Sequence, residues 1–172
     1  MISKKMAKAI NEQINAEIYS AYLYFSMSSH AAANGLPGAA NWMYIQAKEE
    51  LTHALRFYRY LNDQGEQGLM QAVAAPPTSF KSALHMFEET LKHEKLVTSR
   101  INELADLAVR EKDHATAAML QWFITEQVEE EKNAVEIIQH LKMVGENQGA
   151  LLMLDQKLGA RAFTPPPDMQ GL

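Results

Sequence analysis

The sequence predicts an all-α protein, an up-down-down-up four-helix bundle with a long crossover and a short fifth helix at its C-terminal end. Apolar residues recur at alternating steps of three and four along four long segments, which is the spacing of helices packed in a left-handed bundle. The first and last connections between these segments are tight, whereas the middle one is long. A length of 172 residues, 47% of them hydrophobic, suffices for a single domain over residues 1–172.

The first two helices are expected over residues 4–33 and 37–64. Asn34-Gly35 ends the first and Pro37 is placed to open the second, because glycine follows helix ends and proline suits the first helical position. The inward positions are Ile10, Ile14, Glu17, Ala21, Tyr24 and Ser28 on the first helix and Met43, Ala47, Glu50, Ala54, Phe57 and Leu61 on the second. The short link makes these helices an antiparallel hairpin.

The third and fourth helices are expected over residues 80–111 and 114–144, with Thr78 or Ser79 as the N-cap of the third. The inward positions are Leu84, Phe87, Leu91, Glu94, Thr98, Ile101, Ala105 and Ala108 on the third helix and Leu120, Phe123, Gln127, Glu130, Ala134, Ile137, Leu141 and Val144 on the fourth. Because the turn between them is short, they form a second hairpin.

The crossover between the hairpins, about residues 65–79, sets the direction of the third helix. A helix of ~28 residues is ~42 Å long. Fifteen extended residues span at most ~50 Å, so this segment is long enough to climb the whole bundle. The third helix therefore runs in the same direction as the second.

The bundle, residues 4–144, is followed by a short apolar helix at about residues 147–159 and a tail at residues 164–172. The apolar run Ala-Leu-Leu-Met-Leu at 150–154 is too short to span a membrane. The tail contains three consecutive prolines, so we expect it to be extended and flexible.

Five polar residues occupy inward positions near the middle of the four helices, namely Glu17, Glu50, Glu94, Gln127 and Glu130. A buried carboxylate is costly unless it is paired or bound to a cation. Counting from the connecting turns puts the four carboxylates at one height, where their formal charge of minus four matches two divalent cations. The sequence therefore predicts a dinuclear metal site, and the alternative is four acids that are satisfied separately.

The ligand types favour iron. Glu50 and His53 form a Glu-x-x-His motif, which places a carboxylate and an imidazole on one helix face. Carboxylate oxygens suit hard cations, and imidazole shifts the preference toward iron, zinc and similar metals. We expect one metal to be held by Glu17, Glu50 and His53 and the other by Glu50, Glu94 and Glu130, with Glu50 bridging and Gln127 beside the second.

Several stretches resemble bacterial non-haem ferritins, and the likeness covers essentially the whole chain. It rests on Glu17, Tyr24, residues 49–53 and 126–132, and the pairs His93-Glu94 and Gln121-Trp122. The resemblance implies a ferroxidase that oxidises Fe(II) with dioxygen or hydrogen peroxide. It also implies a homo-oligomeric cage of 24 subunits that stores a ferric mineral, with Glu50 as a catalytic residue.

The resemblance further implies a third iron site beside the pair, onto which Glu49, Glu126, Glu129 and Glu130 map. From the residues alone, the alternative for Glu49, Glu126 and Glu129 is a solvated acidic face. Tyr24 maps to a functional tyrosine, which donates an electron or hydrogen-bonds a ligand, and is therefore a second catalytic candidate. Its alternative is a tyrosine that only fills the core.

Two further positions are expected to lie outside the metal chemistry. Trp122 fits packing better than electron donation, and His93 fits a surface or interface position better than a ligand.

No haem is expected, because bacterioferritins carry a methionine directly after the Glu of Glu-x-x-His and a second such motif on the fourth helix. This chain has Leu51 and Gln127-x-x-Glu130 at those places.

Composition limits the partners. The net charge of −5 disfavours nucleic acid and suits attraction of cations, and the absence of cysteine excludes thiolate sites. Residues 18–47 carry no charged side chain but are broken by turns, so no membrane span is expected, and we expect a cytoplasmic protein. The aromatic residues of this stretch are too many to face inward together and predict a subunit interface; they are Tyr19, Tyr22, Phe25, Trp42 and Tyr44.

Three classes of function fit these observations. The leading one is an iron-storage ferroxidase. The second is a di-iron or dimanganese oxidase or peroxidase that stores nothing, because the same bundle site supports that chemistry. The third is a metal-free structural bundle, which the buried acids disfavour.

Overall fold

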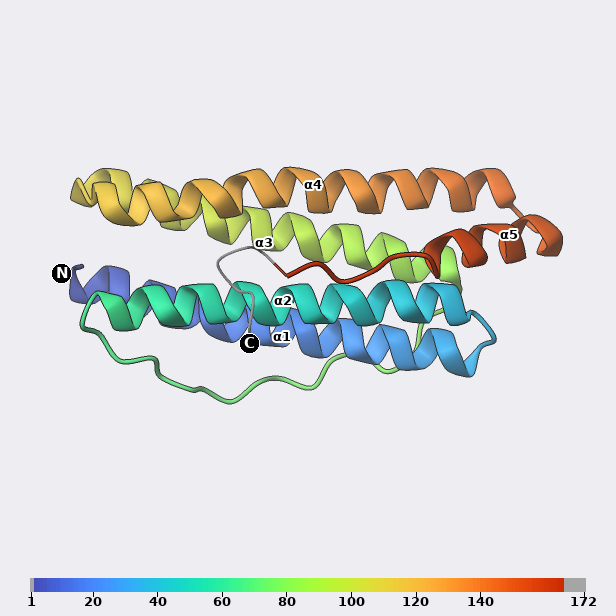
Figure 1. Ribbon diagram of the computed structural model, residues 1–172, viewed down its shortest axis with the longest axis horizontal. Coiled ribbons are helices and arrows are strands. Elements are labelled where there is room, and N and C mark those ends of the chain that lie inside the picture. The colour runs from blue at the N-terminus through green and yellow to red at the C-terminus, as the bar shows by residue number, and fades with distance from the viewer. Residues whose placement is uncertain (1, 166–172) are drawn as a thin grey trace.

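The computed structural model, which describes residues 2–165, is a four-helix bundle with a short fifth helix (Figure 1). Its elements are α1 Lys4–Ala33, α2 Pro37–Asp63, α3 Ala83–Glu111, α4 His114–Val144 and α5 Gln148–Leu158. The crossover between α2 and α3 runs the length of the bundle outside α1 and α2, which confirms the up-down-down-up order. Most of the expected flexible tail, residues 166–172, lies outside the described residues. Within the described part, no helix is both long and apolar enough to cross a membrane.

The start of α3 differs from the expectation. The helix begins at Ala83, and Ser82 is its N-cap, accepting a 3.1 Å hydrogen bond from a backbone N–H three residues on. The proposed caps, Thr78 and Ser79, are exposed and lie before the helix. Phe80 explains the shift, because its side chain is buried in the core from the non-helical crossover.

The apolar core is divided into two clusters by the polar layer. One cluster holds Met27, Met43, Phe87 and Ile137, and the other holds Ile14, Phe57, Ile101 and Phe123. On each of α1 to α4, the inward-facing acids fall between the two clusters. The site is therefore buried at mid-bundle, with close-packed apolar side chains at both ends to fix the four helices around it.

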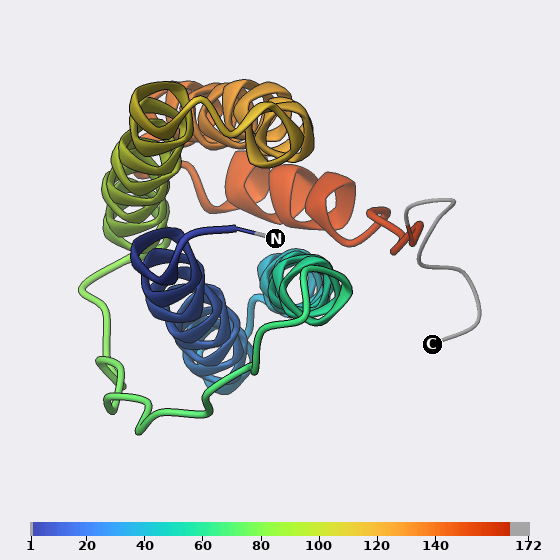
Figure 2. The ribbon, with the colours of Figure 1, turned by 90° about the vertical axis from the view of Figure 1, so that its left-hand side faces the viewer.

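Helix α5 is fixed to the start of α2 by Asp155. Its two carboxylate oxygens accept 2.8 Å hydrogen bonds from the backbone N–H groups of Gly38 and Ala39, at the positive end of the α2 dipole. The approach is so close that a Cβ at Gly38 would lie 1.7 Å from the Asp155 carbonyl oxygen. Figure 2 shows that α5 and the segment after it lie on the α2–α4 side of the bundle.

The uncharged aromatic stretch is partly exposed, as expected. Tyr22, Phe25 and Tyr44 are 51%, 37% and 48% exposed. Trp42 instead faces inward and packs edge-on against Phe87. The exposed rings lie on α1 and α2, and their role as a subunit interface stays a prediction.

Candidate metal centre

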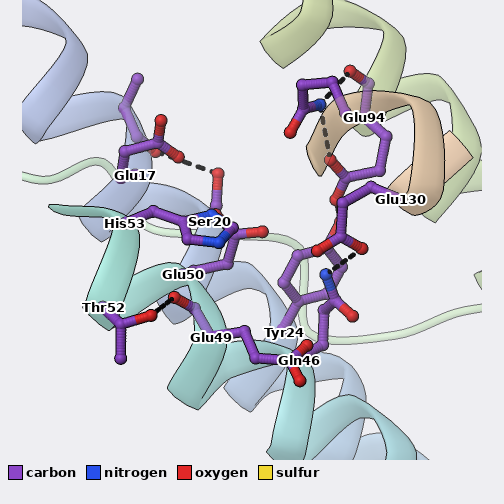
Figure 3. A network of polar contacts seen from close by, with 12 residues as sticks. Glu17, Ser20, Tyr24, Gln46, Glu49, Glu50, Thr52, His53, Glu94 and Glu130 are labelled. Carbon is purple, nitrogen blue, oxygen red and sulfur yellow. Dashed lines mark hydrogen bonds and ion pairs between the residues drawn. The ribbon is translucent and has the colours of Figure 1, made fainter. Parts of the chain in front are cut away.

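Four carboxylates, one from each long helix, converge in the layer between the apolar clusters (Figure 3). Glu17, Glu50 and Glu94 are each 1% exposed, and Glu130 is 5% exposed. The structure thus brings together the acids that counting along the helices had placed at one height. Figure 3 shows Glu17 and Glu50 on one side of the layer and Glu94 and Glu130 on the other.

The first side has the geometry of a cation site. Glu17, Glu50 and His53 each offer a ligand atom, and these atoms lie within 4.8 Å of one another. His53 Nδ1 is 3.5 Å from Glu50 Oε2. Glu17 Oε2 and Glu50 Oε2 are buried and accept no hydrogen bond within the described part of the chain. Since an unpartnered buried carboxylate oxygen is costly, these two atoms fit a bound cation.

On the second side, neutral donors satisfy the acids. The Tyr24 hydroxyl donates to Glu94 Oε1, and Gln127 Nε2 donates to Glu94 Oε2 over 3.2 Å. Gln46 Nε2 donates to Glu130 Oε2 over 2.7 Å. Gln127 therefore contacts the Glu94 carboxylate through its amide nitrogen, and its place among the metal ligands stays a prediction.

The grouping of possible ligands on this side differs from the expected set. His53, Glu126 and Glu130 bring ligand atoms within 4.8 Å of one another, and Glu94 joins neither of the two such groups found among the described residues. Glu94 is instead held by Tyr24 and Gln127. The assignment of Glu94 to the second metal accordingly stays a prediction.

Two glutamines of the layer were missed from the sequence. Gln13 donates a 2.8 Å hydrogen bond to Glu17 Oε1, and Gln46 donates to Glu130. Each lies four residues before an inward glutamate, Glu17 or Glu50, on the same helix. A Gln-x-x-x-Glu spacing on an inward stripe places both side chains on one face and is the signal that could have found them.

Burial and mutual repulsion set the protonation of the layer. Burial, followed by the charge of Glu50, raises the pKa of Glu17 well above 4.5. Burial and the charge of Glu94 likewise raise the pKa values of Glu50 and Glu130. Burial raises the pKa of Glu94, although the hydrogen bonds from Tyr24 and Gln127 oppose this. Without cations, the layer therefore holds protons that bound cations would displace.

The three outer acids differ in their surroundings. Glu49 and Glu126 are partly buried, and burial raises the pKa of both carboxyls. Glu129 is exposed. Glu49 forms an ion pair with Arg161, a residue of the segment after α5 that the sequence had not singled out.

Tyr24, Trp122 and His93 each contact other residues of the bundle interior. Tyr24 is fully buried, and Trp122 packs edge-on against His53 with ring centroids 5.3 Å apart. His93, which fits a surface or interface position better than a ligand, is half-buried on α3 and contacts Ser20 of α1. Its Nε2 atom is 2.8 Å from Ser20 Oγ, and burial lowers its pKa to about 4.

The comparisons with known proteins agree with this geometry. A sequence model of the family described as "Ferritin-like domain" matches residues 7–144. The "Bacterial non-heme ferritin" of Staphylococcus saprophyticus is 42% identical over 163 residues, covering 95% of this chain and 98% of the relative. The corresponding protein of Staphylococcus aureus is 39% identical with the same coverage.

Solved structures extend the likeness to three dimensions. An engineered closed form of Archaeoglobus fulgidus ferritin superposes with a TM-score of 0.94 and is 48% identical, covering 95% of this chain and all of the other. The open-pore ferritin of the same archaeon gives a TM-score of 0.93 at 48% identity over 94% of this chain. By sequence, fold and buried acidic layer, the chain belongs to the ferritin family and resembles its bacterial non-haem members.

Proposed function

We propose that this chain is an iron-storage ferroxidase that oxidises Fe(II) in the buried layer and stores the ferric product inside a cage of 24 copies. The observation that carries the proposal is the convergence of four buried acids, two of which keep an oxygen atom without a hydrogen-bond partner. A protein without a cationic substrate would gain stability by replacing such groups with apolar ones. Their presence in a ferritin-family bundle supports iron as that substrate.

Each acid has a proposed role. Glu17, Glu50 and His53 hold the first iron, because their ligand atoms already lie close together. Glu50, Glu94 and Glu130 hold the second, so that Glu50 bridges the two. Gln127 then acts through its hydrogen bond to Glu94, which fixes the orientation of that carboxylate.

The redox step needs two electrons from two neighbouring Fe(II) ions. Dioxygen takes both electrons and two protons to give hydrogen peroxide, or hydrogen peroxide takes two electrons and two protons to give two waters. Tyr24 is placed to assist because its hydroxyl donates to Glu94. If a third Fe(II) and Tyr24 each supply one further electron, dioxygen takes four electrons and four protons to give two waters, and the phenolic proton of Tyr24 passes to the Glu94 carboxylate.

Storage requires an exit for the product and an assembly to hold it. Glu49, Glu126, Glu129 and Glu130 are proposed as a third iron site, and Glu126 and Glu130 bring ligand atoms within 4.8 Å of each other and of His53. The exposed rings of Tyr22, Phe25 and Tyr44 provide an apolar surface for contact between copies.

Particle size and iron uptake test the proposal together. Apoprotein is fractionated by size, loaded anaerobically with Fe(II) and then exposed to oxygen. We expect a particle of roughly 460 kDa, which is 24 times the 19.3 kDa chain, and far more than three irons per chain. A small oligomer that retains two metals per chain and no mineral would identify the non-storing oxidase instead.

A further inference from the structure

The segment after α5 places a positive charge against the outer acids. Arg161 Nη2 pairs with Glu49 Oε2, and Arg161 Nη1 donates a 2.8 Å hydrogen bond to Gln46 Oε1. The guanidinium also lies over the Trp42 ring, with its Cζ 4.3 Å from the ring centroid. The side chains of Arg161 and Glu49 are 19% and 23% exposed, so water screens the pair only in part.

The backbone holds Arg161 in place independently of its charge. Asn41 Nδ2 donates to the carbonyl oxygens of Gly159 and Arg161, over 3.3 Å and 2.9 Å. Further along, Lys48 Nζ lies 4.4 Å from the centroid of the Phe163 ring. The α5 helix before this segment is fixed by Asp155. The approach of Arg161 to Glu49 is therefore built into the fold rather than due to a loose chain end.

The ion pair determines where Glu49 points. Figure 3 shows its side chain extending toward Gln46. Glu49 does not join the group in which His53, Glu126 and Glu130 bring ligand atoms within 4.8 Å, nor the other such group of the described chain. A cation bound by that group gains Glu49 as an additional ligand only when the Glu49 side chain turns toward it, and this turn pulls Oε2 away from Arg161.

We propose that Arg161 is the cation that occupies Glu49 of the outer site, which Glu49 forms with Glu126 and Glu129, and that a third iron must displace Arg161 to gain Glu49 as a ligand. The inference deepens the proposed function and rests on it. A charge-assisted bond to a partly buried carboxylate opposes the incoming ion, so Arg161 weakens the outer site by about tenfold. A weak outer site lets the oxidised ion move on to the mineral instead of remaining beside the dinuclear centre.

Equilibrium binding of Zn²⁺ to the assembled apoprotein tests the proposal without any redox reaction. Isothermal titration gives the affinity of each equivalent, and anomalous diffraction from Zn²⁺-soaked crystals locates the ions. Arg161→Gln should tighten the third equivalent about tenfold and leave the first two unchanged. In its crystals, Glu49 should be turned onto the third ion. Arg161→Lys keeps the charge, so its affinity for the third equivalent should be closer to that of the parent than the affinity of Arg161→Gln is.

Lys157→Gln is the matched control for loss of one positive charge. Lys157 is on α5 and lies 4.0 Å from Glu136, outside the outer site. An unchanged third affinity in Arg161→Gln would overturn the proposal, and so would an equal tightening in Lys157→Gln. The proposed function fails separately, if the parent protein takes up no Zn²⁺ in the layer of Glu17, Glu50 and Glu130.

Discussion

Replacing Glu17 by Gln should stabilise the apoprotein at pH 8. Gln is nearly isosteric, and its amide oxygen can still accept the hydrogen bond from Gln13. Its amide nitrogen replaces Glu17 Oε2, which accepts no hydrogen bond, and faces the layer in which Glu50 Oε2 accepts none either. The change removes a buried charge or the cost of protonating it, and it supplies an N–H donor at any pH.

The size of the expected stabilisation follows from the two buried carboxylate oxygens that accept no hydrogen bond, Glu17 Oε2 and Glu50 Oε2. An unsatisfied buried acceptor costs about 1–3 kcal/mol, so we expect a gain of that size in the free energy of unfolding. For a chain of this length each kcal/mol corresponds to about 2–4 °C in melting temperature.

The raised pKa of Glu17 determines how the stability gain of Glu17→Gln changes with pH. The pKa of Glu17 in the folded protein is raised above 4.5. Its contribution to stability is therefore fully present below pH 4.5 and is lost as the pH rises through the folded pKa. The advantage of Gln should be small at pH 5 and larger at pH 8.

Thermal melting of iron-stripped protein at pH 5 and pH 8 measures the stability gain and its pH dependence. Glu94→Gln is the matched comparison, because Tyr24 and Gln127 already donate to both Glu94 oxygens and an amide nitrogen there would face a donor. It should stabilise less than Glu17→Gln. The reasoning is refuted if Glu17→Gln melts below the parent at pH 8, or if its advantage is the same at both pH values.

Three further predictions follow from the same contacts. Glu50→Ala should abolish fast Fe(II) oxidation in stopped-flow measurements while the cage still forms, and a near-parental rate would exclude the bridging role. Replacing Glu49, Glu126 and Glu129 together by Ala should keep the first two-iron oxidation fast, raise the peroxide released and slow later turnovers. If the peroxide released per oxygen and the rate of later turnovers are both unchanged, these acids form only a solvated face. Asp155→Ala should lower stability by about 1–3 kcal/mol, because two buried N–H groups lose their acceptor, with Asp155→Asn intermediate in denaturant unfolding; equal midpoints would refute this.

Local sequence patterns were sufficient for the helices and for the acidic layer. Steps of three and four identify the inward stripe of each helix, and distances from a turn give the height of each residue. Both rules depend on residues near one another in the chain, so they placed Glu17, Glu50, Glu94 and Glu130 together correctly.

The remaining features depend on contacts that periodicity does not encode. Arg161 meets Glu49 across 112 residues, and Asp155 meets Gly38 across 117. Whether Phe80 continues a helix or packs from a coil is decided by the core it enters, so the start of α3 was misplaced. The partners of Glu94 likewise depend on side-chain orientation at the layer, which a helical stripe leaves open.

The central claim is that the buried layer binds two irons bridged by Glu50. Anomalous diffraction at the iron edge, from crystals soaked anaerobically with Fe(II), tests it most directly. We expect two peaks per chain about 3.5–4 Å apart, with Glu50 between them, Glu17 and His53 on one and Glu94 and Glu130 on the other. A layer without peaks, or a single peak that Glu50 does not contact, would contradict it.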